Sequence, residues 1–102
     1  MSQATITEVI NGVNVDRLGG MIRTVQQNPT MANFQFRAKN RWIGGGHNRS
    51  TIQSFYGAGQ EDTARKKPFV LDSDEPPVLL GKDHGANPYE YVLHALAAGL
   101  TT

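Results

Sequence analysis

The feature that most constrains this chain is a helix signature near its C-terminal end. Residues 85–90 read Gly-Ala-Asn-Pro-Tyr-Glu, which places Asn87 at the N-cap, Pro88 at the first helical position and Glu90 at the third. This capping box predicts a helix that begins at Pro88. The residues that follow are apolar on nearly all sides of that helix: Tyr89, Val92, Leu93, Ala95, Leu96, Ala97, Ala98 and Leu100. We therefore expect a buried central helix.

The predicted helix has no exit signal. Thr101 and Thr102 follow its last apolar residue without a Gly, a Pro or a basic last turn. We expect that the chain ends inside a helix and that its 102 residues are a piece of a longer design. No apolar run approaches the roughly 20 residues that span a bilayer, and residues 1–10 lack the pattern of a signal peptide. We expect a cytoplasmic protein that does not bind membranes.

Alternating residue types predict antiparallel strands in the middle of the chain. From residue 33 onward, apolar and basic side chains occupy opposite faces, with Phe34, Phe36, Ala38, Asn40 and Trp42 on one face and Arg37, Lys39 and Arg41 on the other. Residues 44–48 supply a Gly-rich turn, and residues 49–55 form a second strand of the same hairpin. Residues 60–67 read as a charged, exposed stretch, and residues 68–71 as a third short strand.

The N-terminal part predicts a helix over residues 15–27, with Asn14 as its cap and Asn28-Pro29 as its stop. Two central glycines each cost about 1 kcal/mol relative to Ala, so this helix needs a neighbour and is a docking arm. The whole chain is then one α+β region, an antiparallel sheet with a helical arm leading into a central helix. Its parts are the arm (1–29), the strands (33–72), an acidic Pro-rich loop (73–87) and the start of the central helix (88–102).

The charges are separated along the chain. Residues 1–60 hold six basic and two acidic side chains, and residues 61–102 hold four and seven. Aromatic and basic residues interleave along the first strand, as in a stacking platform for single-stranded nucleic acid. Alternation places the two kinds on opposite faces, however, which favours a buried aromatic face and a solvated basic one. A nucleic-acid-binding sheet is therefore the weaker alternative, and complementary charges meeting within the fold or across a dimer are preferred.

The chain has no cysteine, which excludes disulfides, thiolate zinc sites and thiol nucleophiles. His47, His84 and His94 lack the spacing of metal ligands, so we predict no metal site. Four acidic residues could bind a hard cation, but a Pro-Pro loop without EF-hand spacing favours a solvated turn: Asp72, Asp74, Glu75 and Asp83. The Gly-rich turn matches no phosphate-binding loop, and no cofactor is predicted.

The order of these segments is similar to the N-terminal half of the OsmC-like superfamily, which includes osmotically inducible and organic hydroperoxide resistance proteins. The resemblance covers nearly the whole chain, through the arm over residues 11–29 and residues 36–50 (FRAKNRWIGGGHNRS), 69–77 (FVLDSDEPP), 80–91 (LGKDHGANPYEY) and 93–98 (LHALAA). Its most diagnostic part is the Gly-x-Asn-Pro-x-Glu helix start followed by Leu-x-Ala-Leu.

This resemblance implies an α+β fold whose sheet leads into a long central helix, with two chains intertwined in a dimer. Active members are thiol peroxidases, in which a cysteine on the central helix attacks an organic hydroperoxide and an Arg and a Glu organise the thiolate. The attacking cysteine falls at Gly99 here. The resemblance gives Arg49 or His47 the role of the cation and Glu90 that of the carboxylate. The family's Glu more often follows Pro directly, whereas Tyr89 stands between Pro88 and Glu90 here. Two roles for Glu90 are therefore equal alternatives: completing the capping box and taking part in the site.

The expected function is that of an OsmC-like oxidative-stress protein related to thiol-dependent hydroperoxide reductases and inactive as written, since Gly99 carries no thiol. The alternative is a non-catalytic binding or assembly module on the same fold. The expected partners are a second copy of the chain, in an intertwined homodimer, and an organic hydroperoxide or another small apolar ligand.

Overall fold

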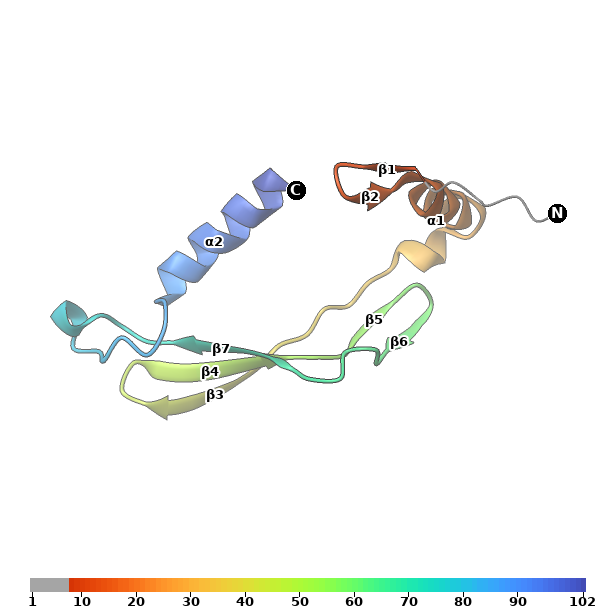
Figure 1. Ribbon diagram of the computed structural model, residues 1–102. Helices are drawn as coiled ribbons and strands as arrows, with labels where there is room; N and C mark the ends of the chain where they lie inside the picture. The colour runs from red at the N-terminus through yellow and green to blue at the C-terminus, as the bar shows by residue number, and fades with distance from the viewer. Residues whose placement is uncertain (1–7) are drawn as a thin grey trace. The chain divides into compact units, whose positions relative to one another are not determined.

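The computed structural model describes residues 8–102, which form two compact units. Residues 8–35 and 55–62 make the first, here called the arm unit. Residues 36–54 and 63–102 make the second, the sheet unit. Residues 1–7, the beginning of the predicted arm, lie outside the described residues. Helices and antiparallel strands occur together along the chain, as expected of an α+β fold (Figure 1).

The arm unit begins with a very short hairpin. Strand β1 (Val9–Ile10) pairs with β2 (Val13–Asn14). The two residues between them, Asn11 and Gly12, have φ angles of 51° and 77°. Asn and Gly tolerate this left-handed backbone at low cost, which is why such pairs close two-residue hairpins.

Helix α1 (Val15–Gln27) follows directly and confirms the helix predicted over residues 15–27. The Arg17 amide donates a hydrogen bond to the Asn14 side chain at 3.0 Å, so Asn14 is the cap that the sequence indicated. The 3-10 helix η1 (Pro29–Ala32) begins after Asn28. Proline at its start ends α1, because the ring cannot donate the next helical hydrogen bond.

A second hairpin completes the arm unit. Strand β5 (Phe55–Gly57) pairs with β6 (Gln60–Asp62). The Phe34 ring stacks on Phe55 with 6.4 Å between ring centroids, and a side chain at Gly57 would overlap the Phe34 ring. Residues 60–67 were expected to be a charged, exposed stretch, and most of them are exposed, but the sequence did not predict the strand over Gln60–Asp62. Pairing with β5 decides its conformation, and its polar sequence gave no signal of that pairing.

The sheet unit is built on three antiparallel strands. They lie in the order β3 (Lys39–Gly44), β4 (His47–Ile52), β7 (Phe69–Ser73), as Figure 1 shows. The β3–β4 hairpin and the third strand are confirmed, but the second strand, expected over residues 49–55, begins at His47 and ends at Ile52. The first strand begins at Lys39, later than expected, because Gln35 pairs with Tyr56 in the arm unit.

Apolar side chains stay accessible throughout the described residues, none of which contributes a buried hydrophobic side chain. The prediction of a buried aromatic face is wrong within this chain, since Phe36 is 73% exposed and Trp42 71% exposed. The Trp42 indole donates a hydrogen bond to the Gly45 carbonyl at 2.9 Å, which ties it to the turn without burying it. Each unit is therefore ordered mainly by hydrogen bonds and lacks an apolar core of its own.

Helix α2 (Pro88–Thr101) begins at the predicted residue with the predicted capping box. The Glu90 amide donates to the Asn87 side chain at 2.9 Å, and the Asn87 amide donates to the Glu90 carboxylate at 3.0 Å. The helix is not buried within the single chain. Its large apolar side chains are 60–80% exposed: Tyr89, Val92, Leu93, Leu96 and Leu100. None of the described helices is long and apolar enough to cross a membrane.

The loop between β7 and α2 folds back on the end of the sheet. It contains the 3-10 helix η2 (Pro77–Leu79) and two glycines that its path requires. A side chain at Gly81 would overlap the Glu75 carbonyl, and one at Gly85 would overlap the Asp72 carbonyl. These close approaches hold the start of α2 against β7.

We expect Gly85→Ala to lower the free energy of unfolding by on the order of 1–3 kcal/mol, because the new methyl group must push the loop off the Asp72 backbone. The matched control is Gly99→Ala on α2, where a side chain would meet no atom within 4 Å. That change should stabilise the helix by about 1 kcal/mol. Urea unfolding followed by circular dichroism measures both. Equal effects of the two substitutions would contradict the close approach.

Candidate functional site

Two adjacent strands bring charged side chains to one face of the sheet unit. Arg49 on β4 lies directly opposite Asp72 on β7 in the register of the sheet. The Arg49 Nε and Nη2 atoms donate to the two carboxylate oxygens of Asp72 at 2.5 and 3.0 Å. His47, two residues before Arg49, shares this face because side chains alternate along a strand. Its Nε2 atom lies 3.5 Å from the Asp72 carboxylate.

Asp74 lies just beyond β7 and is the most buried charged residue described, at 2% exposure. Its carboxylate accepts hydrogen bonds from the backbone amides of Glu75, Lys82 and His84 at 2.8, 3.2 and 3.2 Å. The His84 Nδ1 atom lies 2.6 Å from the same carboxylate. The expectation that this acidic loop is a solvated turn is therefore wrong at Asp74. The loop wraps around a carboxylate that its amides satisfy.

These partners hold both carboxyl groups in their charged form. The hydrogen bonds from the Arg49 guanidinium lower the pKa of Asp72 from 3.8 to about 2. The hydrogen bond to His84, helped by the three backbone amides, holds the pKa of Asp74 well below its ordinary value. Burial acts in the opposite direction at both residues and is outweighed.

Two of the three histidines meet at this site. The rings of His47 and His84 stack with 4.2 Å between centroids and 4° between planes. One ligand atom from each of them and one from Asp74 all lie within 4.8 Å of one another. The separation of these histidines along the sequence gave no sign of this meeting. We call the set His47, Arg49, Asp72, Asp74 and His84 the charged face.

A pocket of about 620 Å³ opens beside the charged face. The Gly-rich turn forms one wall, and the loop around Leu80 to Lys82 forms another. His47, Asp74 and His84 all contribute to its lining.

The residues that the resemblance assigned to a peroxidase site are not brought together in one chain. Glu90 completes the capping box, the first of its two predicted roles. Arg49 binds Asp72, and among the described residues no ion pair joins Arg49 to Glu90. A side chain at Gly99 would meet no atom within 4 Å. Position 99 is thus open, with no cation of its own chain at contact distance.

Sheet geometry explains this separation. A second pocket, of about 330 Å³, lies between the sheet and the first turns of α2. Its lining includes Ser50 and Leu71, which pair with each other, and Tyr91 on the helix. Arg49 and Asp72 are the next residues along their strands and point to the opposite face. We call the α2 side of the sheet, with this pocket, the helix face. The predicted cation and the predicted helix site lie on different faces.

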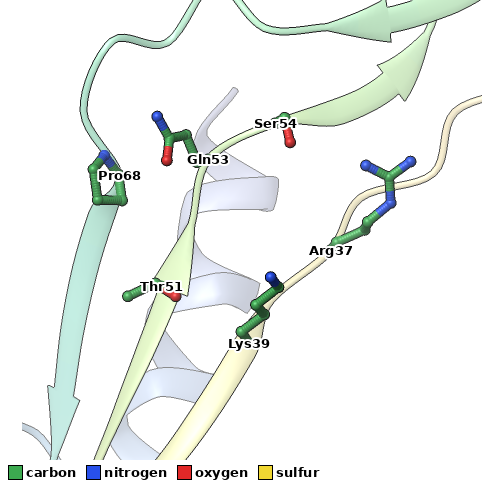
Figure 2. A pocket seen from close by; sticks show the side chains of 6 residues that line it. All are labelled: Arg37, Lys39, Thr51, Gln53, Ser54 and Pro68. Carbon is green, nitrogen blue, oxygen red and sulfur yellow. The ribbon is translucent and has the colours of Figure 1, made fainter.

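The basic residues of β3 give no stacking platform. Figure 2 shows a pocket of about 270 Å³ with Arg37 and Lys39 on one side and Gln53 and Pro68 on the other. Lys39 pairs with Thr51 and shares the charged face, whereas Trp42 pairs with Asn48 and points to the helix face. This arrangement agrees with the predicted separation of cations and aromatic rings.

Comparison with known proteins adds no family. No protein-family model matches the chain, and no curated protein matches it either. The OsmC-like assignment therefore stays a prediction from the motifs quoted above. The α+β architecture and the two faces of the sheet are the structural observations on which a function must be built.

Sequence signals for the charged face existed in part. Asp72 and Asp74 are two residues apart at the end of a predicted strand, a spacing that puts both on one face. Arg49 and His47 have the same spacing on the neighbouring strand. What sequence reasoning missed is the pairing register, which sets Asp72 opposite Arg49, and the return of the loop that brings His84 back to Asp74.

Asp72 gives the site a pH dependence. A group whose pKa is lower in the folded state stabilises the fold above its unfolded pKa and loses that effect as pH falls toward the folded value. With a pKa lowered from 3.8 to about 2, the contribution of Asp72 should be complete above about pH 4 and lost progressively down to about pH 2.

A carboxyl ¹³C NMR titration measures the pKa of Asp72 in the folded chain. Arg49→Gln should return the midpoint toward 3.8, because the hydrogen bonds that lower the pKa are gone. Arg41→Gln is the matched control, since Arg41 lies opposite Arg49 on β3 and carries the same charge. If both substitutions move the midpoint equally, general charge and not the paired guanidinium sets the pKa.

Proposed function

We propose that this chain is an OsmC-like oxidative-stress subunit that works as an intertwined homodimer and binds a small apolar molecule, such as an organic hydroperoxide, without reducing it. The observation that carries the proposal is the exposed apolar surface of α2. Five large apolar side chains of a well-capped helix are 60–80% exposed in the single chain. A surface of this kind is typical of a protein–protein interface.

A second copy of the chain is the occupant that fits this helix best. The described residues contain no buried hydrophobic side chain, so every apolar face that could cover α2 is itself exposed and available on another copy. Trp42 on β3, at 71% exposure, and Leu93 and Leu96 on α2, at 64% and 60%, are examples of such exposed apolar side chains. Homodimers bury such surfaces on both chains at once, with each copy covering the other.

The pocket on the helix face supports an apolar ligand. Ala38, Ile52 and Leu71 line it from the sheet and Pro88 and Tyr91 from α2. Its volume of about 330 Å³ lies at the lower end of the range for small-molecule sites. The Tyr91 hydroxyl donates to the Asp72 carbonyl at 2.6 Å, which fixes the helix side of the pocket.

The absence of a thiol supports binding without reduction. Reduction of a hydroperoxide by this family's chemistry needs a thiolate that attacks the peroxide oxygen, gives the alcohol and becomes a sulfenic acid. The chain contains no cysteine, and position 99 is glycine. Its Arg49, engaged by Asp72, faces away from its own α2, so a cation for position 99 must come from the second copy.

The dimer is tested first. At micromolar concentration the chain should sediment as a dimer, and Leu96→Glu should weaken dimerisation at least tenfold by placing a charge in the apolar interface. Thr101→Glu adds the same charge at the end of the same helix and should leave the dimer intact. Analytical ultracentrifugation distinguishes these cases. The proposal would be wrong if the wild-type chain sediments as a monomer, or if Leu96→Glu dimerises as tightly as the wild type.

The second test restores the missing sulfur. In the dimer, the thiol of Gly99→Cys should be alkylated by iodoacetamide with a pKa below the free value of about 8.5, because a cation of the other copy favours the thiolate. The wild-type chain should consume no cumene hydroperoxide in the presence of dithiothreitol.

Adding Leu96→Glu to Gly99→Cys, which separates the copies, should return the alkylation pKa to about 8.5. Adding Arg49→Ala in the intact dimer should do the same if the cation is the guanidinium that the resemblance names. If the thiol titrates at the free value in the dimer, with or without Arg49, the chain has no peroxidase-like site, and its resemblance to the OsmC-like family is one of fold alone. Mass spectrometry of the alkylated chain gives each rate as a function of pH.

A further inference from the structure

We propose that His47, Asp74 and His84 form a binding site for a divalent zinc-like cation on the charged face. The three residues come from different segments: the start of β4, the residue after β7 and the loop before α2. One ligand atom from each lies within 4.8 Å of the others. This site lies on the face of the sheet opposite the apolar pocket, and the evidence for it includes neither the dimer nor the apolar ligand of the proposed function.

An unsatisfied ring nitrogen is the observation that points to a ligand. The His47 Nε2 atom is buried and has no hydrogen-bond partner. Its nearest carboxylate, that of Asp72, is 3.5 Å away, beyond a normal hydrogen bond, and both oxygens of that group bind Arg49. Buried polar atoms without a partner are rare and costly. A cation coordinated by Nε2 would remove this cost.

The three ligand side chains favour zinc and similar transition-metal ions over magnesium or calcium. Two imidazoles and one carboxylate are the protein ligands of many open zinc sites, in which water or substrate takes the fourth position. Imidazole nitrogen is a poor ligand for the hard cations, which prefer oxygen. The pocket of about 620 Å³ beside His47, Asp74 and His84 supplies both the entry path and the room for the fourth ligand.

Asp74 is already prepared to bind a cation. Its three backbone amide donors fix the carboxylate, as outer hydrogen bonds do for metal ligands. Its side-chain ion-pair partner is His84, and among the described residues no Lys or Arg pairs with it. Its negative charge is thus held in place without being neutralised by a permanent cation. Lys82 contributes its backbone amide to the carboxylate, and its side chain is exposed.

Binding requires only a small movement. Ligand atoms around a tetrahedral zinc lie about 3.4 Å apart. A separation of up to 4.8 Å in the cluster must therefore shorten, whereas His84 Nδ1 and the Asp74 carboxylate, 2.6 Å apart, must separate. The His84 side chain is 46% exposed, and it contacts His47 and Asp74, the other two members of the cluster. In the Gly-rich turn, a methyl group added at Gly44 or Gly45 would meet no atom within 4 Å, whereas one at Gly46, next to His47, would lie 3.3 Å from Glu75 and 3.4 Å from the Asp74 carboxylate.

Isothermal titration calorimetry of the untagged chain with ZnCl₂ tests the site. We expect saturable binding of one Zn²⁺ per chain and affinity at least tenfold weaker in His84→Ala and in His47→Ala. His94→Ala is the matched control, because this third histidine lies on α2 outside the cluster. It should bind Zn²⁺ as the wild type does. Circular dichroism checks that each variant keeps its secondary structure.

A second measurement does not depend on removing a ligand. Co²⁺ added to the wild-type chain should give the intense visible absorption of a four-coordinate site, and Zn²⁺ should displace it. An octahedral Co²⁺ spectrum, no saturable binding at one ion per chain, or equal affinity in the wild type, His84→Ala and His47→Ala would each overturn the proposal. Loss of binding in His94→Ala would do so as well.

Discussion

The buried carboxylate of Asp74 is the interaction on which the sheet unit depends. A charge at 2% exposure is stable only when hydrogen bonds replace its water, and here three backbone amides and an imidazole do so. Two of those amides belong to Lys82 and His84, so satisfying the charge also closes the loop. The closed loop then sets where α2 begins, because the Asp74 amide donates to the Ala86 carbonyl next to the helix cap.

This polar interaction orders the chain locally but does not supply the driving force of a globular fold. Apolar burial contributes about 25 cal/mol per Å², and the described residues bury no hydrophobic side chain completely. Hydrogen bonds alone contribute little net stability, because water offers the same bonds to the unfolded chain. The apolar side chains of α2 and of the helix face of the sheet therefore contribute little burial energy within the single chain.

Local structure was predictable from the sequence wherever short-range chemistry decides it. Both helices begin at the predicted residues, since Asn14 and Asn87 cap them by contacts three residues away. The β3–β4 hairpin follows from alternation and a Gly-rich turn. Strand β6 and the meeting of His47 with His84 were not predictable, because pairing register and loop return depend on contacts between distant residues. Burial was misjudged for the same reason, as it depends on surfaces that one chain does not show.

The alternation of β4 has a consequence for how activities can be combined on this fold. Successive residues of a strand face opposite sides, so Arg49 and Ser50 belong to different environments although they are neighbours in sequence. The charged face concentrates ionised and imidazole groups, and the helix face holds a pocket lined by apolar side chains together with Asn48, Ser50 and Ser73. The two pockets thus lie on opposite faces of one sheet. Within the single chain, a side chain at position 99 would meet no atom within 4 Å, and Arg49 is engaged by Asp72 on the charged face.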